Sequence, residues 1–297
     1  MVDYVEKLII FISTPIYVVL ILGEIILSNW HNRKLYTFGD TVQNLYLMLA
    51  NMGVDLLMRG ITLFVLLFFF DYRLFSWNTS SWYYWTLLFL AEDFIFYWIH
   101  RIDHVVRFFW AVHVTHHSSD KYNLTTGFRS SVFQPVYRFI WFIPLVFLGF
   151  EPFDIFIMYS ITQTYGILVH TKAVGKLGIL EHFLVTPSHH RVHHASNVEY
   201  LDKNMGMILI LWDKLFGTFQ PEIEGLPIEF GLYEKKISNN PANVIFHEWI
   251  AIGKDVRKVK GVKNKWHYIT KPPGWSHDGS TMTSTELRNH LKQVKND

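Results

Sequence analysis

The stretch "TPSHHRVHH" at residues 186–194 places four histidines within six positions of the sequence. In a helix, residues four apart lie on the same face, so these histidines form two i, i+4 pairs. Neutral imidazole is the commonest metal ligand among protein side chains. The stretch therefore predicts a metal site that is carried by a short helix.

Two similar clusters precede this stretch, "HRIDH" at residues 100–104 and "HVTHH" at residues 113–117, and another histidine ends an apolar segment at position 170. An isolated histidine is usually structural. Ten histidines on one wet face would repel one another when protonated, and a metal that binds the neutral rings removes this conflict. The ten candidate ligands are His100, His104, His113, His116, His117, His170, His189, His190, His193 and His194.

Ten imidazoles are too many for one ion and predict two metals, with room for one or two of the histidines in the outer shell. Imidazole suits zinc, copper, iron and nickel, so the ligand type leaves the metal open. The "HEWIA" segment has Ala251 where a zinc protease motif needs its second histidine. A pair of irons can use dioxygen to oxidise an unactivated C–H bond. Such a pair explains both the large number of imidazoles and the absence of a hydrolytic zinc motif. Zinc is a further candidate in purified protein.

The composition excludes several other classes of site and partner. The chain has 297 residues, no cysteine, a formal net charge of +2 and 17% aromatic residues. Without cysteine, disulfides, zinc thiolates and iron–sulfur clusters are excluded. The balanced charge predicts no nucleic-acid partner.

Long apolar segments predict an all-α integral membrane protein, because about 20 helical residues cross a bilayer. We expect about four transmembrane helices, counted as three spans plus a helical hairpin, under a histidine-rich helical cap that holds the two metals. The expected spans are residues 8–27, 44–70 and 82–99, and the arms of the hairpin are residues 139–150 and 153–169.

Basic residues follow the first and third spans, whereas the loop between the second and third spans has only Arg73. The positive-inside rule then places the histidines in the cytosol. The lack of cysteine favours a bacterial inner membrane, with the endoplasmic reticulum as the eukaryotic alternative. We expect N-terminal transmembrane helices in residues 1–81, a catalytic domain in residues 82–222 and a polar cytosolic extension in residues 223–297.

The three histidine boxes and the blocks around them resemble the fatty acid hydroxylase/sterol desaturase superfamily of membrane di-iron enzymes, and most closely its alkylglycerol monooxygenase branch. The likeness covers roughly residues 92–222 and is most specific in "TPSHHRVHHASNVEYLDKNMGMILILWDKLFGTF". The resemblance implies that the box histidines bind two irons and that His170 is an additional ligand.

The resemblance also implies the reaction, which is hydroxylation of a lipid C–H bond with dioxygen, on an ether lipid or a related lipid. A sterol, carotenoid or sphingoid desaturase or hydroxylase of the same superfamily is the alternative. Electrons are expected from a separate reductase or a diffusible reductant, and tetrahydrobiopterin is the donor that the branch suggests.

Four residues near the boxes have two interpretations each. Asp103 either supports a ligand histidine from outside the coordination sphere or is a solvated acid at a helix end. Arg129 either binds a lipid phosphate or anchors the fold. Asn123 and Asn204 either hydrogen-bond ligand rings or stabilise turns.

A membrane metal transporter or metal sensor is the alternative from another functional class. It predicts ionisable residues along a path through the bilayer. Here the histidines lie at the ends of spans, and only four polar residues lie deep. These deep residues are Glu24, Asn51, Asp55 and Arg59.

Overall fold

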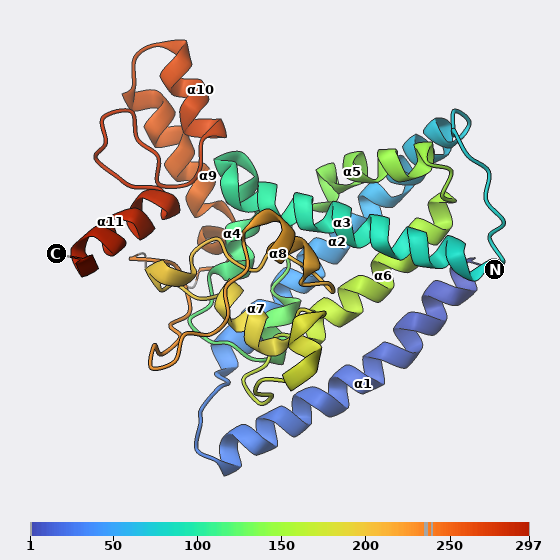
Figure 1. Cartoon of the computed structure of the whole chain (residues 1–297), viewed down its shortest axis with the longest axis horizontal. Coiled ribbons are helices and arrows are strands. Elements are labelled where there is room, and N and C mark those ends of the chain that lie inside the picture. The colour runs from blue at the N-terminus through green and yellow to red at the C-terminus, as the bar shows by residue number, and fades with distance from the viewer. Residues whose placement is uncertain (1, 235–236, 239, 297) are drawn as a thin grey trace.

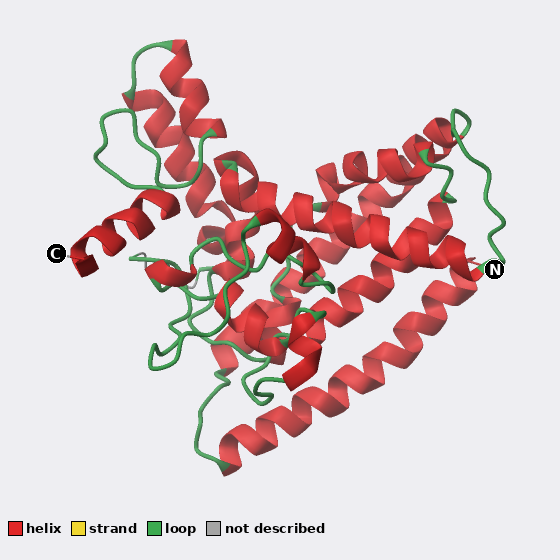
Figure 2. Ribbon diagram, viewed as in Figure 1, coloured by secondary structure: helices red, strands yellow, loops and turns green. Residues whose placement is uncertain are grey.

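The computed structural model describes residues 2–234, 237–238 and 240–296, and these residues form helices and loops with only two isolated β-bridges. Figures 1 and 2 show the helices and the loops that connect them. The elements are α1 (Val2–Trp30), α2 (Phe38–Phe70), α3 (Trp82–Val105), α4 (Arg107–His117), η1 (Leu124–Phe128), α5 (Pro135–Phe147), α6 (Pro152–Leu168), η2 (Gly178–His182), α7 (Pro187–His193), η3 (Val198–Tyr200), α8 (Leu211–Phe216), α9 (Pro241–Lys258), α10 (Val262–Thr270) and α11 (Ser284–Asn296).

Two helices in the described part of the chain are long and apolar enough to cross a membrane. They are α1, over Phe11–Trp30, and α2, over Phe38–Phe70. Most of their side chains are exposed rather than packed into the protein. Exposed apolar side chains on a helix of this length are typical of a lipid-facing span, so the helices indicate a membrane protein.

The remaining predicted crossings form helices, but they do not meet the same criterion. α3 carries three buried acids, Glu92, Asp93 and Asp103, and Asp93 accepts hydrogen bonds from the backbone amides of Ile208 and Leu209 at 3.0 and 3.1 Å. These bonds hold the loop before α8 against α3. The hairpin arms α5 and α6 have 13 and 17 residues and are short for complete crossings. The expected total of about four transmembrane helices, and their orientation, stay predictions.

A hydrophobic core joins α2 and α3 to the hairpin formed by α5 and α6. It contains Leu66 of α2, Leu88 of α3, Leu145 of α5 and Ile155 of α6, all fully buried. The hairpin turns at Gly149, whose φ is +90°. A Cβ atom built there would lie 2.0 Å from the carbonyl oxygen of Phe75, so the turn requires glycine.

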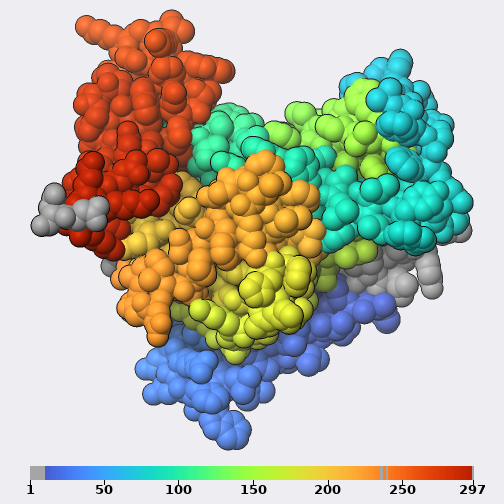
Figure 3. All heavy atoms as spheres, in the orientation of Figure 1, coloured from blue at the N-terminus to red at the C-terminus, as the bar shows by residue number. Residues whose placement is uncertain are grey.

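The opposite end of the bundle is built from short helices and loops that enclose the histidine clusters. The loops gather there in Figure 2, and α9, α10 and α11 lie beyond them at the C-terminal end. The space-filling view in Figure 3 shows residues of about 180–220 covering this region. Arg107 joins α4 to α9 through ion pairs of 2.8 Å to both Glu248 and Asp255.

Arg129 has the contacts of a fold anchor. Its side chain is 1% exposed, and its Nε donates to the carbonyl oxygen of Thr115 at 2.9 Å. Its terminal nitrogens donate to Ser118 Oγ at 2.8 Å and to Asn44 Oδ1 at 2.9 Å. The guanidinium thus ties α2 to the end of α4, and its donors point into the protein rather than towards lipid.

We predict that Arg129→Met destabilises the fold, because it leaves several buried acceptors without a donor. The melting temperature of the detergent-solubilised protein should fall by about 5–10 °C, which corresponds to roughly 2–4 kcal/mol. Differential scanning fluorimetry measures the shift, with Arg257→Met on the polar end of α9 as the control. A melting temperature that matches that of the wild type would contradict the anchoring role.

Candidate metal centre

The histidine boxes lie on elements that meet at one end of the helical bundle. "HRIDH" forms the last turns of α3, and "HVTHH" forms the end of α4. α7 carries "HHRVH", begins with Pro187 at its first turn, and is capped by Thr186. Proline and a hydroxyl cap favour a helix start, which fixes the direction in which the α7 histidines point.

Nine histidines form two groups, and within each group one nitrogen of every ring lies within 4.8 Å of the others. The first histidine group combines α3, α4 and α7, and the second combines α4, the short segment after α6, and the end of α7. The first group is His100, His104, His113, His117 and His193, and the second is His116, His170, His190 and His194. The predicted convergence of the boxes is therefore present in the fold.

The nitrogens that face one another are mostly Nε2 atoms. In the first group, His113 Nε2 lies 3.2 Å from His100 Nε2 and 3.1 Å from His117 Nε2. In the second group, His170 Nε2 lies 2.9 Å from His190 Nε2 and 3.1 Å from His194 Nε2. The ring planes of His117 and His194 stack at 4.4 Å, which places the two groups side by side.

The other ring nitrogen, Nδ1, points outwards in most of these residues. It lies within hydrogen-bond distance of an oxygen that belongs to the surrounding backbone or to a carboxylate. A carbonyl or carboxylate oxygen only accepts, so the proton of the neutral ring is on Nδ1 and Nε2 is free to bind a metal. The pairs are His100 with the carbonyl of Met205 (2.8 Å), His104 with Asp202 Oδ1 (3.1 Å), His116 with the carbonyl of Arg129 (2.9 Å), His170 with the carbonyl of Gly166 (2.7 Å) and His193 with the carbonyl of Lys203 (2.9 Å).

Burial keeps these imidazoles uncharged. Removal from water disfavours the protonated ring and lowers the pKa of His116 to about 4. Burial, reinforced in most cases by the neighbouring rings, lowers the pKa of the other affected histidines well below the ordinary value of 6.5. These are His100, His113, His117, His170, His190, His193 and His194.

The residues fit a pair of metal ions. His116 Nε2 and His170 Nε2 lie 3.3 Å apart. Each ring donates its Nδ1 proton to a backbone carbonyl outside the group, so no proton lies between the two Nε2 atoms. Buried His104 Nε2 and His193 Nε2 have no hydrogen-bond partner. A cation between the nitrogens removes both the repulsion and the unpaired lone pairs. Five and four imidazoles suit iron, zinc, copper or nickel.

His189, which the sequence placed among the ligands, joins neither group. Its Nδ1 lies 3.2 Å from the carbonyl oxygen of Leu184, and its Nε2 lies 3.9 Å from Glu181 Oε2. The register of α7 explains the difference, because Thr186 caps the helix and turns this first histidine back towards the residues before it. We therefore leave His189 out of the proposed ligand set.

Asp103 and the two asparagines take different positions. Asp103 is fully buried, accepts from Tyr137 at 2.8 Å, and lies 3.9 Å from His113 Nδ1. Burial raises the pKa of Asp103 to about 7. Asn123 caps η1, and Asn204 donates to the backbone carbonyl of His189 at 3.0 Å, so both bond to backbone rather than to a ligand ring.

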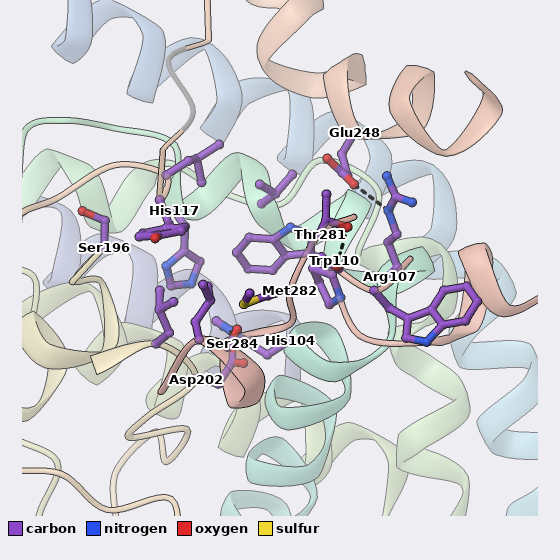
Figure 4. Close-up of a pocket in the computed structure, with 18 of the residues that line it drawn as sticks. His104, Arg107, Trp110, His117, Ser196, Asp202, Glu248, Thr281, Met282 and Ser284 are labelled. Carbon is purple, nitrogen blue, oxygen red and sulfur yellow. Dashed lines mark hydrogen bonds and ion pairs between the residues drawn. The ribbon is translucent and has the colours of Figure 1, made fainter. Parts of the chain in front are cut away.

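Two cavities reach the histidines from different sides. The inter-helix cavity, of about 110 Å³, lies between α2, α3, α5 and α6 and is lined by His100 and His113 of the first group and His116, His170 and His190 of the second. The C-terminal cavity, of about 470 Å³, is lined by His104, His117 and His193 of the first group and by residues from the C-terminal segment (Figure 4).

Several residues of the site were not found from the sequence. Asp202, which orients His104, lies in a loop 98 positions away from it. Trp110 of α4 packs against His104 and His117 with ring centroids 5.1 and 5.6 Å apart. The segment after residue 240, which was expected to be an extension, supplies Tyr268 and other lining residues of the C-terminal cavity. The "HRIDHVVRFFW" run could have suggested Trp110, because positions 110, 113 and 117 share a helical face.

We predict that the metal-free protein loses stability as the pH falls from 7.5 to 5. The folded state holds imidazoles with lowered pKa values, so below about 6.5 the unfolded chain binds more protons and is favoured. The raised pKa values of buried carboxyl groups such as Asp103 and Asp213 act in the opposite direction, but the imidazoles with lowered pKa values outnumber them. Thermal melts after chelation should show the decline, and a melting temperature that does not change over this range would contradict it.

Comparison with known proteins identifies one family domain in the chain. Residues 85–218 match the model of the fatty acid hydroxylase family. The chain is 36% identical over 277 residues to the alkylglycerol monooxygenase of Homo sapiens. The matched region covers 92% of this chain and 60% of that protein. It is 37% identical over 274 residues to the alkylglycerol monooxygenase of Danio rerio, covering 89% of this chain and 59% of that protein.

The chain is also 30% identical over 132 residues to an ornithine lipid hydroxylase of Rhizobium tropici, which covers 44% of this chain and 40% of that protein. It thus spans about three fifths of the length of the alkylglycerol monooxygenases it matches. No solved structure is significantly similar to it. Residues 85–218 of the chain thus match a fatty acid hydroxylase domain.

Proposed function

We propose that this protein is a membrane di-iron oxygenase that hydroxylates a lipid C–H bond with dioxygen, and that the nine grouped histidines hold the two irons. The observation that carries the proposal is the pair of buried groups whose neutral Nε2 atoms converge without protons. Relatives named as alkylglycerol monooxygenases and as a lipid hydroxylase support the reaction class.

We further propose that the substrate is an ether lipid such as an alkylglycerol. The inter-helix cavity supports this substrate class. It connects both histidine groups with the space between the apolar helices, where an alkyl chain can lie. Its wall also contains polar side chains, among them Gln134, Tyr159 and Gln163. Such groups suit the ether or hydroxyl oxygens of a glycerol unit, while the alkyl chain follows the apolar surface.

The side chains around the groups position the ligands and keep the site dry. Asp202 and the backbone carbonyls hold the Nδ1 protons and so aim each ring. When bound, the two irons would supply the two-electron oxygen chemistry that insertion into a C–H bond requires. The overall reaction places one oxygen atom in the lipid and reduces the other to water, with two electrons and two protons from a donor.

Hydroxylation next to an ether oxygen has a chemical consequence that helps to identify the substrate. The product is a hemiacetal, which separates into an aldehyde and an alcohol without further catalysis. An ether lipid would therefore yield a fatty aldehyde and glycerol or its derivative. A sterol or a sphingoid base would instead retain its hydroxyl group or gain a double bond, so product analysis separates these alternatives.

The deep polar residues favour an enzyme over a metal transporter. Glu24 accepts hydrogen bonds from two hydroxyl groups and from a backbone amide of the neighbouring loop. Asn51 donates to the carbonyl oxygen of Ser131 at 2.8 Å, and Asp55 pairs with Arg138 at 2.6 Å. These residues fasten helices to one another, which differs from the solvated path that ion permeation requires.

For location, we propose that the histidine-bearing end faces the cytosol, of a bacterial inner membrane or, in a eukaryote, of the endoplasmic reticulum. The basic residues that follow α1 and lie at the end of α3 support this orientation. A separate reductase or a diffusible reductant on that side would then supply the electrons.

We predict that His113→Ala and His170→Ala each lower the iron content of the purified protein from about two ions per chain to one or fewer. Each substitution removes a ring at the centre of its group. His189→Ala is the matched control and should retain both irons, because His189 lies outside both groups. Elemental analysis of protein from iron-supplemented cells measures the content. Loss of iron in the control alone would reverse the assignment.

We also predict oxygen-dependent conversion of 1-O-alkylglycerol to fatty aldehyde by the iron-loaded protein, measured by mass spectrometry with dithionite-reduced enzyme and ¹⁸O₂. Asp202→Asn should lower the rate, with about a tenfold loss as a guide, because it weakens the orientation of His104. If iron-replete protein leaves ether lipids unchanged but oxidises a sterol, the proposed substrate is wrong and a sterol takes its place. If the protein oxidises none of the lipids, the proposed function is contradicted.

A further inference from the structure

Positive charge is concentrated at the end of α9, in the loop that follows it and over α10. Residues 254–271 contain seven basic residues and one acid, whereas the whole chain has a net charge of only +2. The acid, Asp255, is already paired with Arg107 at 2.8 Å. The seven basic side chains are exposed, and no acid in the described part of the chain forms an ion pair with them. The residues of this basic patch are Lys254, Arg257, Lys258, Lys260, Lys263, Lys265 and Lys271.

Large apolar side chains are exposed beside the basic patch. Val262 and Trp266 of α10 are 84% and 62% exposed, and Phe246 and Ile250 of α9 are 42% and 52% exposed. The members of each pair are four positions apart, so each pair lies on one face of its helix. A helix that exposes apolar residues next to lysine and arginine is typical of binding at the membrane–water interface, where tryptophan is also enriched.

The start of α9 packs against a helix that is long and apolar enough to span a membrane. Val244 and Ile245 of α9 share a hydrophobic cluster with Leu47 of α2. The Phe246 ring packs against that of Phe133, with centroids 5.8 Å apart. Figure 1 shows α9 and α10 projecting to one side of the bundle, at the end that carries the histidines. The exposed apolar residues of α9 therefore begin beside the lipid-facing surface of α2.

The two faces of α10 have different surroundings. Tyr268 is buried and lines the C-terminal cavity, whereas Trp266 is exposed. Residues two positions apart lie on nearly opposite faces of a helix. The face that carries Val262 and Trp266 therefore points away from the protein and is available to another surface.

We propose that the end of α9, the following loop and α10 dock on anionic phospholipid headgroups of the membrane that α2 spans. The exposed apolar side chains enter the interface, and the basic patch binds the lipid phosphates. Charge complementarity and continuity with the lipid-facing surface of α2 favour a membrane over a protein partner. The cytosolic leaflet of cell membranes is anionic, which agrees with the orientation proposed above.

A spin label can test this docking, because the chain has no cysteine that would be labelled elsewhere. Val262→Cys carries a nitroxide on the whole chain in nanodiscs of phosphatidylcholine, with or without phosphatidylglycerol. Collision rates with oxygen and with a water-soluble nickel chelate distinguish label in lipid from label in water. We expect a lipid-immersed label in anionic nanodiscs and its release in neutral ones or at high salt. Val294→Cys is the control, because this exposed valine lies on α11 and should stay in water in both lipids.

Paired substitutions test the role of the charge. Lys263→Gln with Lys265→Gln, added to Val262→Cys, should lower the ratio of immersed to free label about tenfold in anionic nanodiscs, since attraction to the surface sums over basic residues. Lys176→Gln with Lys292→Gln is the matched control, because it removes the same charge from exposed positions outside the basic patch. Circular dichroism and the melting temperature should show that both double variants are folded.

Three results would overturn the inference. One is equal immersion of the label in neutral and anionic nanodiscs, and another is an equal effect of the two double substitutions. The third is a label that stays in water in both lipids, which would leave the basic patch to an acidic protein partner. None of these measurements requires bound metal or turnover, so the proposed function is tested separately.

Discussion

The structure depends on one electrostatic constraint at the buried histidines. Backbone carbonyls and a carboxylate bind Nδ1–H of several rings from outside, which leaves their Nε2 lone pairs directed towards one another. His116 and His170 face each other in this way at 3.3 Å. Burial keeps the rings neutral, so protons do not relieve the repulsion, and a bound cation does. The fold thus holds together a set of neutral donors that the proposed metals would complete.

The rest of the fold serves this arrangement. Apolar helices carry the clusters to one end of the bundle, where α3, α4 and α7 meet. Arg129 fixes the end of α4 against α2, and Asp93 fixes the loop before α8 against α3. Because these anchors are buried and paired, the ligand rings rest on a rigid frame. The proposed oxidation of a strong C–H bond requires such rigid placement, since it would set the distance between the metals and the substrate.

Much of this could be predicted from the sequence, because helical spacing fixes which residues share a face. The boxes at 100–104 and 113–117 converge for that reason, and His170 joins them from the end of α6. His189 lies outside both groups, since the cap at Thr186 sets a register that spacing alone does not reveal. Asp202 and the C-terminal lining were missed because they reach the site through loops, whose paths are set by tertiary contacts rather than by local pattern.

Extended X-ray absorption fine structure at the iron edge tests the central claim most directly. The account predicts about two irons per chain, each surrounded by imidazole nitrogens at roughly 2.0–2.2 Å, with the outer-shell scattering typical of histidine rings. His113→Ala should reduce that scattering, whereas His189→Ala should leave it unchanged. Iron coordinated mainly by oxygen, with the histidine signature missing from the wild-type protein, would contradict the assignment of the two histidine groups as a metal centre.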